Sequence, residues 1–220
     1  MLESLSRFLP DFFSGLVVNF EIAICALLGG ILLGAPLAAA RFRNKLAATP
    51  AAWLVAVLRT IPTFAVMFFL VNVMPSSFSV GGWQFHMTPW LAVALSLTLY
   101  AAAYVSDNAV EAMRQVRSGS PVAAMLFLMS LVRAFFVMVL SSGFGAAVGV
   151  VEATTITLRA VEVLPKLSDR LLLIGLVIVI FTACFQVIYH IINLLRGKLN
   201  RRFYQPLEAA RLSGTGSRQP

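Results

Sequence analysis

Apolar residues gather in five long stretches of this 220-residue chain, and short polar segments separate them. A helix needs about 20 apolar residues to cross the hydrocarbon core of a bilayer, which is about 30 Å thick. The pattern therefore predicts an all-α membrane protein with five transmembrane helices. The predicted spans are residues 16–40, 53–74, 89–107, 124–150 and 171–195.

Charges in the connecting segments alternate along the chain. Lys and Arg follow the first, third and fifth stretches, whereas residues 75–88 contain neither and residues 152–170 are nearly neutral. Cytoplasmic loops accumulate Lys and Arg, and short translocated loops do not. The alternation therefore predicts an external N-terminus and an internal C-terminus. The basic residues concerned are Arg41, Arg43, Lys45, Arg114, Arg117, Arg196, Lys198, Arg201 and Arg202.

The same pattern divides the chain into three parts. Residues 1–14 form a predicted extracytoplasmic segment, residues 15–202 the transmembrane domain, and residues 203–220 a cytoplasmic tail. Hydrophobic residues make up 60% of the chain and charged residues 12%, whereas soluble domains usually have about 45–50% and about 25%. Much of the formal charge of +8 lies near the ends of the apolar stretches, where it sets the orientation in the membrane. No basic face interleaved with aromatic residues indicates nucleic-acid binding. We therefore expect a lipid bilayer, and no nucleic acid, around the chain.

The second stretch is the least regular of the five. About a dozen residues separate Pro62 from Pro75, and at about 1.5 Å per residue they are too short to cross a bilayer. We therefore expect this helix to begin near Trp53 and to carry Arg59 within it. Two positions for the arginine side chain stay open: it snorkels to the cytoplasmic side, which we favour, or it faces a wet cavity.

No motif indicates an enzyme. The chain lacks a glycine-rich phosphate-binding loop, and it shows no cluster of metal-ligating residues or catalytic constellation. The isolated His86 and His190 have predicted structural roles, and Cys25 and Cys184 are predicted to be small buried hydrophobic residues. We therefore expect no catalytic residue, no metal site and no cofactor in this chain.

Two pairs of glycines stand four residues apart, Gly30 with Gly34 and Gly145 with Gly149. This spacing lets helix backbones approach closely in a membrane. We expect both pairs to serve helix packing, and they give no information about a substrate.

Polar residues inside the apolar stretches are the candidates for a solute path, because intramembrane ionisable residues usually face the interior of a helix bundle. For Asn72 and Thr98 we favour hydrogen bonds between helices instead, and for Arg133 snorkelling to the membrane surface. For Glu21 both interpretations stay open. The four candidate path residues are Asn19, Glu21, Arg59 and Asp107.

The segment from Ala103 to Ala124, AYVSDNAVEAMRQVRSGSPVAA, resembles a cytoplasmic loop of ATP-binding cassette (ABC) importer membrane subunits of the polar amino acid permease family. In that family the third span ends in an A-Y-x-x-E-type sequence, and a Gly follows before Glu-Ala-Ala. Residues 15–43, 57–69 and 145–154 also resemble family segments, in the same order. The residues that match the loop pattern are Ala103, Tyr104, Asp107, Gly119, Ala123 and Ala124.

The resemblance implies a type I ABC importer permease fold and a path for a polar amino acid such as histidine, glutamine or glutamate. It also implies three kinds of protein partner: a second permease subunit, identical or different, a dimer of cytoplasmic ATPases, and an extracytoplasmic substrate-binding protein. ATP and magnesium would bind to the ATPases and not to this chain. The implied location is the inner membrane of a bacterium.

The family's loop forms a short helix that docks in a groove of the ATPase, and this chain departs from its pattern. Val122 stands where the family has Glu, and residues 140–143 replace an L-K-D-T-S stretch. Either a sister permease carries an intact loop, or this chain couples through a rebuilt element. An alternative function is a non-transporting scaffold that pairs with an active permease. The candidate coupling residues are Arg114, Arg117, Gly119, Pro121, Ala123 and Ala124.

Overall fold

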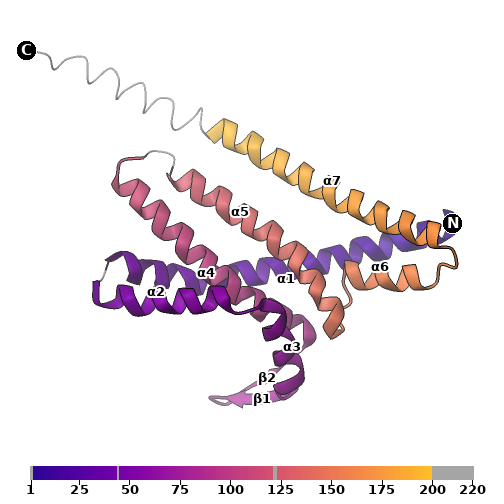
Figure 1. Cartoon of the computed structure of the whole chain (residues 1–220), viewed down its shortest axis with the longest axis horizontal. Coiled ribbons are helices and arrows are strands. Elements are labelled where there is room, and N and C mark those ends of the chain that lie inside the picture. Colours follow the sequence, from indigo (N-terminus) through magenta and orange to yellow (C-terminus); the bar gives the residue numbers. More distant parts are fainter. Residues whose placement is uncertain (1, 44, 121–122, 200–220) are drawn as a thin grey trace, which may run out of the picture.

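The computed structural model describes residues 2–43, 45–120 and 123–199 as an elongated bundle of helices (Figure 1). Pro121, Arg201, Arg202 and the predicted tail 203–220 lie outside the described residues. The helices are α1 (Leu2–Arg43), α2 (Lys45–Thr60), α3 (Thr63–Val73), α4 (Pro89–Arg117), α5 (Ala123–Ser141), the 3₁₀ helix η1 (Ser142–Val148), α6 (Ala153–Glu162) and α7 (Leu167–Leu199).

Helices α1 and α4 form the centre of the bundle and cross at a stripe of small residues. A Cβ added to Gly30 would collide with Ala101, and one added to Gly34 would lie 2.5 Å from the backbone oxygen of Ala102. The backbones can approach this closely only because glycine has no side chain. The predicted packing role of this glycine pair is therefore confirmed.

The two glycines of the second pair have different roles. Gly145 lies in the 3₁₀ helix η1, and Gly149 ends that helix in the left-handed conformation with a φ of 89°. This conformation is accessible to glycine at little cost, so the residue forms a turn. Gly145 is buried, and a Cβ added there would lie 3.0 Å from Val150 and 3.4 Å from Val93 of α4, whereas one added to Gly149 would meet no atom within 4 Å. Close packing is therefore confirmed for Gly145 and not for Gly149.

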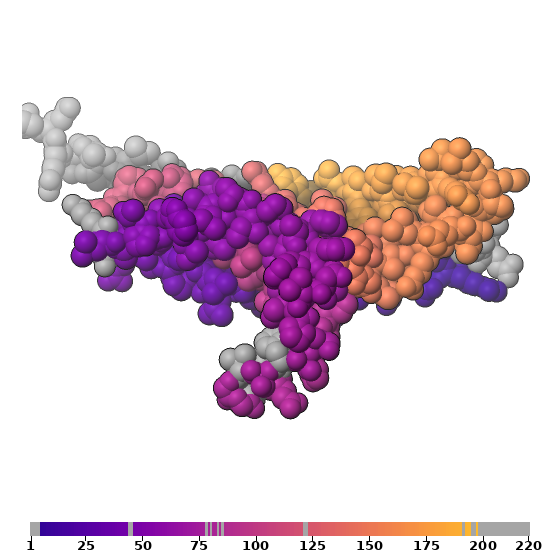
Figure 2. Space-filling view, turned by 60° about the horizontal axis from the view of Figure 1, so that its bottom comes forward, coloured from indigo at the N-terminus to yellow at the C-terminus, as the bar shows by residue number. Residues whose placement is uncertain are grey.

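The second apolar stretch forms two helices and not the single one predicted. Helices α2 and α3 are bent by 82° at a break between Thr60 and Thr63. Pro62 causes the break, because proline lacks an N–H and disfavours the helical conformation of the residue before it. Figure 2 shows α3 projecting sideways from the body of the bundle.

A β-hairpin follows α3 in a segment that the sequence pattern left as a loop. Strands β1 (Ser77–Val80) and β2 (Trp83–His86) pair antiparallel, with Val80 opposite Trp83. Gly81 and Gly82 connect them with φ values of 59° and 86°. A two-residue turn with positive φ at both positions matches the twist of the strands.

Within the described residues, four helices are long and apolar enough to cross a membrane, and the bent pair of α2 and α3 raises this number to five if it forms one span. The four are within α1, α4, α5 with η1, and α7. Residues 2–14, which we predicted as a separate external segment, are the first turns of α1. In Figure 1 these turns lie beside α6 and the start of α7, where Phe8 and Phe12 form a buried cluster.

Candidate functional site

A buried polar network joins α1 to the start of α6. The side-chain amide of Asn19 donates to Glu152 Oε2 at 2.9 Å and to Ser142 Oγ at 2.8 Å. Its Oδ1 accepts from the N–H of Ala153 at 3.1 Å. Asn19, Ser142 and Glu152 are almost completely inaccessible to solvent. The network therefore fixes the first helix of the chain against a segment more than 120 residues away.

Glu152 is the N-cap of α6. Its Oε2 accepts from the N–H of Thr154 at 2.8 Å and its Oε1 from the N–H of Thr155 at 2.9 Å. A carboxylate at this position satisfies the free N–H groups of the first helical turn and interacts favourably with the helix dipole. The hydroxyl of Thr155 lies 3.2 Å from Oε1, but it donates its single proton over the shorter distance of 2.5 Å to the carbonyl of Val150. The buried carboxylate therefore accepts three hydrogen bonds, one from Asn19 and two from the backbone of α6.

A second polar cluster lies near the opposite end of α1. Arg41 Nη1 donates to Asp107 Oδ1 at 2.8 Å and to Ser106 Oγ at 3.0 Å, and Arg59 pairs with the other oxygen of Asp107. The side chains of Arg41 and Asp107 are mostly buried, with 21% and 27% exposed, whereas that of Arg59 is 62% exposed. One carboxylate thus connects α1, α2 and α4.

Arg59 therefore has a partner that the sequence did not reveal. The guanidinium is mostly exposed and reaches Asp107 of α4, and snorkelling to the cytoplasmic side stays a prediction. The bend that follows α2 places Arg59 at the end of a helix and not in the middle of a span. The structure therefore brings together two of the four candidate path residues, Arg59 and Asp107.

The other two candidates lie apart from this pair. Asn19 is buried in the network with Glu152, and Glu21, two residues further along α1, is exposed. Two residues correspond to about 200° around a helix, so the two side chains leave α1 on opposite sides. All four assignments to a solute path stay predictions.

Asn72 and Thr98 hydrogen-bond within their own helices. Asn72 Nδ2 donates to the carbonyl of Phe68 at 2.7 Å, and Thr98 Oγ1 to that of Ala94 at 2.8 Å. The hydrogen bonds between helices that we favoured for both residues are therefore wrong. For Thr98 the reason is its position against Gly29 of α1, which has no side chain that could form a hydrogen bond.

Several other residues singled out from the sequence lie at the surface. Arg133 is exposed on α5, His86 on β2 and His190 on α7. Cys25 is also exposed, so its predicted burial is wrong, and Cys184 is half-buried; both thiols are free. Within the described ranges no group of three or more His, Cys, Asp or Glu side chains lies close enough together to hold a metal ion.

The corner between α4 and α5 carries the predicted coupling residues. Arg114 and Arg117 are exposed on the last turn of α4, and Gly119, with a φ of 83°, follows the helix end. Ala123 is buried with 1% exposed, whereas Ala124 is exposed. At most five residues, 118–122, separate the two helices, and residues 121 and 122 lie outside the described ranges. Five residues are too few for a separate docking helix between them.

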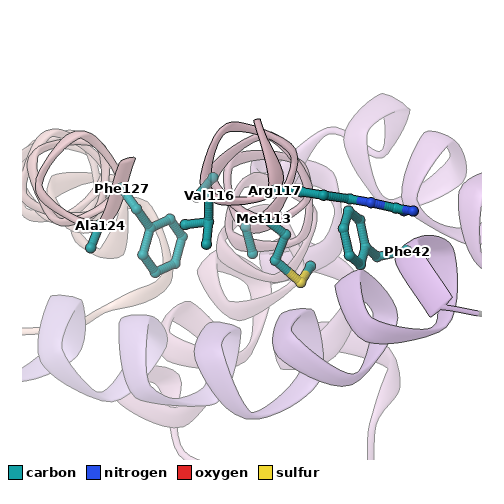
Figure 3. Close-up of a pocket in the computed structure, with 8 residues that line it drawn as sticks. Phe42, Met113, Val116, Arg117, Ala124 and Phe127 are labelled. Atoms are coloured by element: carbon teal, nitrogen blue, oxygen red, sulfur yellow. The ribbon is translucent and has the colours of Figure 1, made fainter. Parts of the chain in front are cut away.

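An open apolar groove of about 540 Å³ lies beside this corner. Side chains of α1, α4 and α5 converge on it (Figure 3). No local sequence pattern indicates this groove, because its walls come from three separate helices. The lining residues are Phe42, Ala109, Ala112, Met113, Val116, Arg117, Ala124 and Phe127.

The sequence matches no protein-family model and no curated protein. The structure is similar to a chain in the crystal structure of an amino acid ABC transporter with histidines. The TM-score is 0.68 at 19% sequence identity, and the similarity covers 92% of this chain and 99% of that chain. This similarity confirms the predicted fold class, an all-α membrane protein with the fold of an ABC transporter chain.

Proposed function

We propose that the chain is the transmembrane subunit of an ABC importer and forms part of the path for a polar amino acid or a related small solute. The observation that carries this proposal is the similarity of fold over nearly the whole length of both chains. In the proposed complex this chain does not hydrolyse ATP. Separate cytoplasmic ATPases bind ATP and magnesium, and a second permease and an extracytoplasmic binding protein complete the importer in a bacterial inner membrane.

The α4–α5 corner supports a cytoplasmic docking role. Arg41 and Arg43 lie in the last turn of α1, and the salt bridge of Arg41 to Asp107 places this residue of α4 beside the end of α1. Helix α4 continues for ten residues to Arg117, which is about 15 Å at 1.5 Å per residue. The ends of α4 and α5 therefore extend past α1 on the basic side, where a cytoplasmic partner would bind.

A non-transporting scaffold is the second candidate, and the short α4–α5 connection favours it. A permease of the resembled type would present a separate helix to the ATPase, and five residues cannot form one. A scaffold needs only to bind another permease, so it has no need of that helix.

Copurification and uptake distinguish the two candidates. The full chain, tagged at its C-terminus, is purified in detergent from its native membrane, and the copurifying proteins are identified by mass spectrometry. An importer subunit brings down an ATPase with phosphate-binding motifs in stoichiometric amount, and its deletion abolishes uptake of at least one radiolabelled amino acid. If uptake of every amino acid survives the deletion, or no ATPase copurifies, the importer proposal is wrong.

A further inference from the structure

Helix α7 packs on the rest of the bundle through one apolar face. The apolar side chains of this face recur every three or four residues along α7, which places them on one side of the helix. The ring of Phe181 lies 5.7 Å from that of Phe12, and Phe185 lies 5.1 Å from Phe136 of α5. The residues of this face that pack on the cluster of Phe8 and Phe12 are Leu173, Leu176, Val177, Ile180, Phe181 and Cys184.

The opposite face of α7 carries a stripe of uncharged polar side chains. Thr182 follows Ile180 by two residues, and Gln186 follows Cys184 by two. Two residues turn a helix by about 200°, so the stripe points away from the bundle. Thr182, Gln186 and Tyr189 are exposed, and Asn193 near the end of the helix is half-buried. The stripe consists of Thr182, Gln186, Tyr189 and Asn193, spaced four, three and four residues apart.

The stripe passes through the middle of the predicted span. Gln186 stands ten residues before Arg196, the first basic residue after the span. At 1.5 Å per residue this distance is about 15 Å, or half of a hydrocarbon core of about 30 Å. Thr182 donates to the carbonyl of Ile178 at 2.8 Å. Among the residues that the structure describes, none hydrogen-bonds the amide of Gln186, which has two N–H groups and a carbonyl oxygen.

Lipid cannot satisfy these groups. A side-chain amide in hydrocarbon loses the hydrogen bonds that it makes in water, and polar residues in spans almost always face a bundle interior or a wet cavity. Thr and Gln can hydrogen-bond across a dry seam between two helices, but the backbones at such seams approach closely through small residues. Gln186 and Tyr189 are large. Water is therefore the environment that suits this face of α7.

We propose that the stripe on α7 lines a water-filled path and contacts a neutral or zwitterionic solute as it crosses the membrane. Amide, hydroxyl and phenol groups both donate and accept hydrogen bonds. They can contact an ammonium and a carboxylate in turn, without the fixed charge that would retain a solute. This inference rests on the proposed function and adds to it the residues of the path. Asn19 and Asp107 are already hydrogen-bonded inside the protein.

Thiol accessibility tests the proposal. Cys25→Ser and Cys184→Ala remove the native thiols, and single cysteines replace Gln186 and, as a control, Val187. Val187 is 59% exposed and lies at nearly the same depth, about 100° around the helix. The complete importer is co-expressed, and a membrane-impermeant trimethylammonium methanethiosulfonate is applied to spheroplasts and to inverted vesicles. A thiol reacts as its thiolate, which forms in water, so Gln186→Cys should react at least about tenfold faster than Val187→Cys.

The other outcomes would overturn the proposal. Equally slow reaction of both cysteines would show that the stripe faces lipid. An oxidant-induced disulfide between two Gln186→Cys chains, without reaction with the reagent, would show a dry seam. Thr182→Cys provides a second reporter if Gln186→Cys fails to assemble. The ATPase is quantified in the same samples. If the complex contains the ATPase but neither Gln186→Cys nor Thr182→Cys reacts, the inference about the path is wrong and the proposed function stands. If the ATPase is absent, the proposed function is wrong.

Discussion

The side-chain amide of Asn19 donates to the carboxylate of Glu152 at 2.9 Å, although 133 residues separate the two in the sequence. Asn19 lies on α1, and Glu152 begins α6. Both are almost completely buried. A buried donor or acceptor that loses its partner costs the desolvation energy of the group that remains. The pair therefore holds α6 in one position on the bundle.

Glu152→Gln should destabilise the protein while leaving its shape nearly unchanged. An amide N–H₂ would replace one of the two oxygens that accept from Asn19, Thr154 and Thr155. At least one of these N–H groups would then be buried without an acceptor, at a cost of about 1–3 kcal/mol in the free energy of unfolding. The measurement is thermal unfolding of the purified protein in detergent, followed by circular dichroism.

Glu162→Gln is the matched control, because Glu162 is exposed at the end of the same helix. It should unfold at the same temperature as the unaltered protein. A Glu152→Gln variant that unfolds together with this control would show that the network contributes nothing to stability.

Much of the bundle could be predicted because its signals are local. Apolar stretches long enough for a bilayer predicted the helices that became α1, α4, α5 and α7, and the spacing of Gly30 and Gly34 predicted a close helix contact that the structure confirms. Each signal depends on residues within a few turns of one another. Such patterns can be recognised in a single sequence without any knowledge of the tertiary structure.

The polar clusters could not be predicted, because their partners are distant in sequence. Glu152 follows an apolar stretch and belongs to the predicted translocated loop, and Glu is not among the residues that usually cap a helix N-terminus. Two local signals were available but missed. Pro62 indicated the break after α2, and Gly81 with Gly82 between alternating residues indicated the β-hairpin.

Arg41→Ala should destabilise the bundle more than Arg59→Ala. Arg41 is largely buried and hydrogen-bonds both Ser106 and Asp107, whereas Arg59 is mostly exposed and contacts Asp107 alone. Exposed ion pairs contribute about 0.2–1 kcal/mol, and removing the better-buried partner leaves Asp107 with weaker compensation. Unfolding temperatures of both variants in detergent, at low and at high salt, provide the comparison.

The salt dependence separates the two arginines further. Salt screens exposed pairs more strongly than partly buried ones, so the effect of Arg59→Ala should almost vanish at high salt and that of Arg41→Ala should persist. Equal losses for both variants at both salt concentrations would contradict this ranking.

Gly30→Ala should loosen the crossing of α1 and α4. The added methyl group would collide with Ala101, and overpacking of this kind typically costs about 1–3 kcal/mol. Gly175→Ala is the control, because a Cβ at Gly175 meets no atom within 4 Å and alanine favours a helix over glycine. The unfolding temperature in detergent should fall for the first variant and stay equal or rise for the second. A lower unfolding temperature for Gly175→Ala than for Gly30→Ala would mean that α1 and α4 are not in tight contact at Gly30.

Ala124→Trp should weaken binding of the proposed ATPase without unfolding the protein. Ala124 is exposed and lines the groove between α1, α4 and α5, so an indole there fills a surface that a partner would contact. The buried Ala123 is unsuitable for such a test, because a large side chain there would disturb the helix itself.

The control for the groove is Leu128→Trp, one turn further along α5. Leu128 is 51% exposed and does not line the groove, so this variant adds an indole outside the groove. The ratio of copurified ATPase to tagged chain should fall for Ala124→Trp and stay unchanged for Leu128→Trp, at equal unfolding temperatures. An ATPase that copurifies equally with both variants would place its binding surface elsewhere. It would then favour a sister permease, and not this chain, as the subunit that transmits ATP hydrolysis to the path.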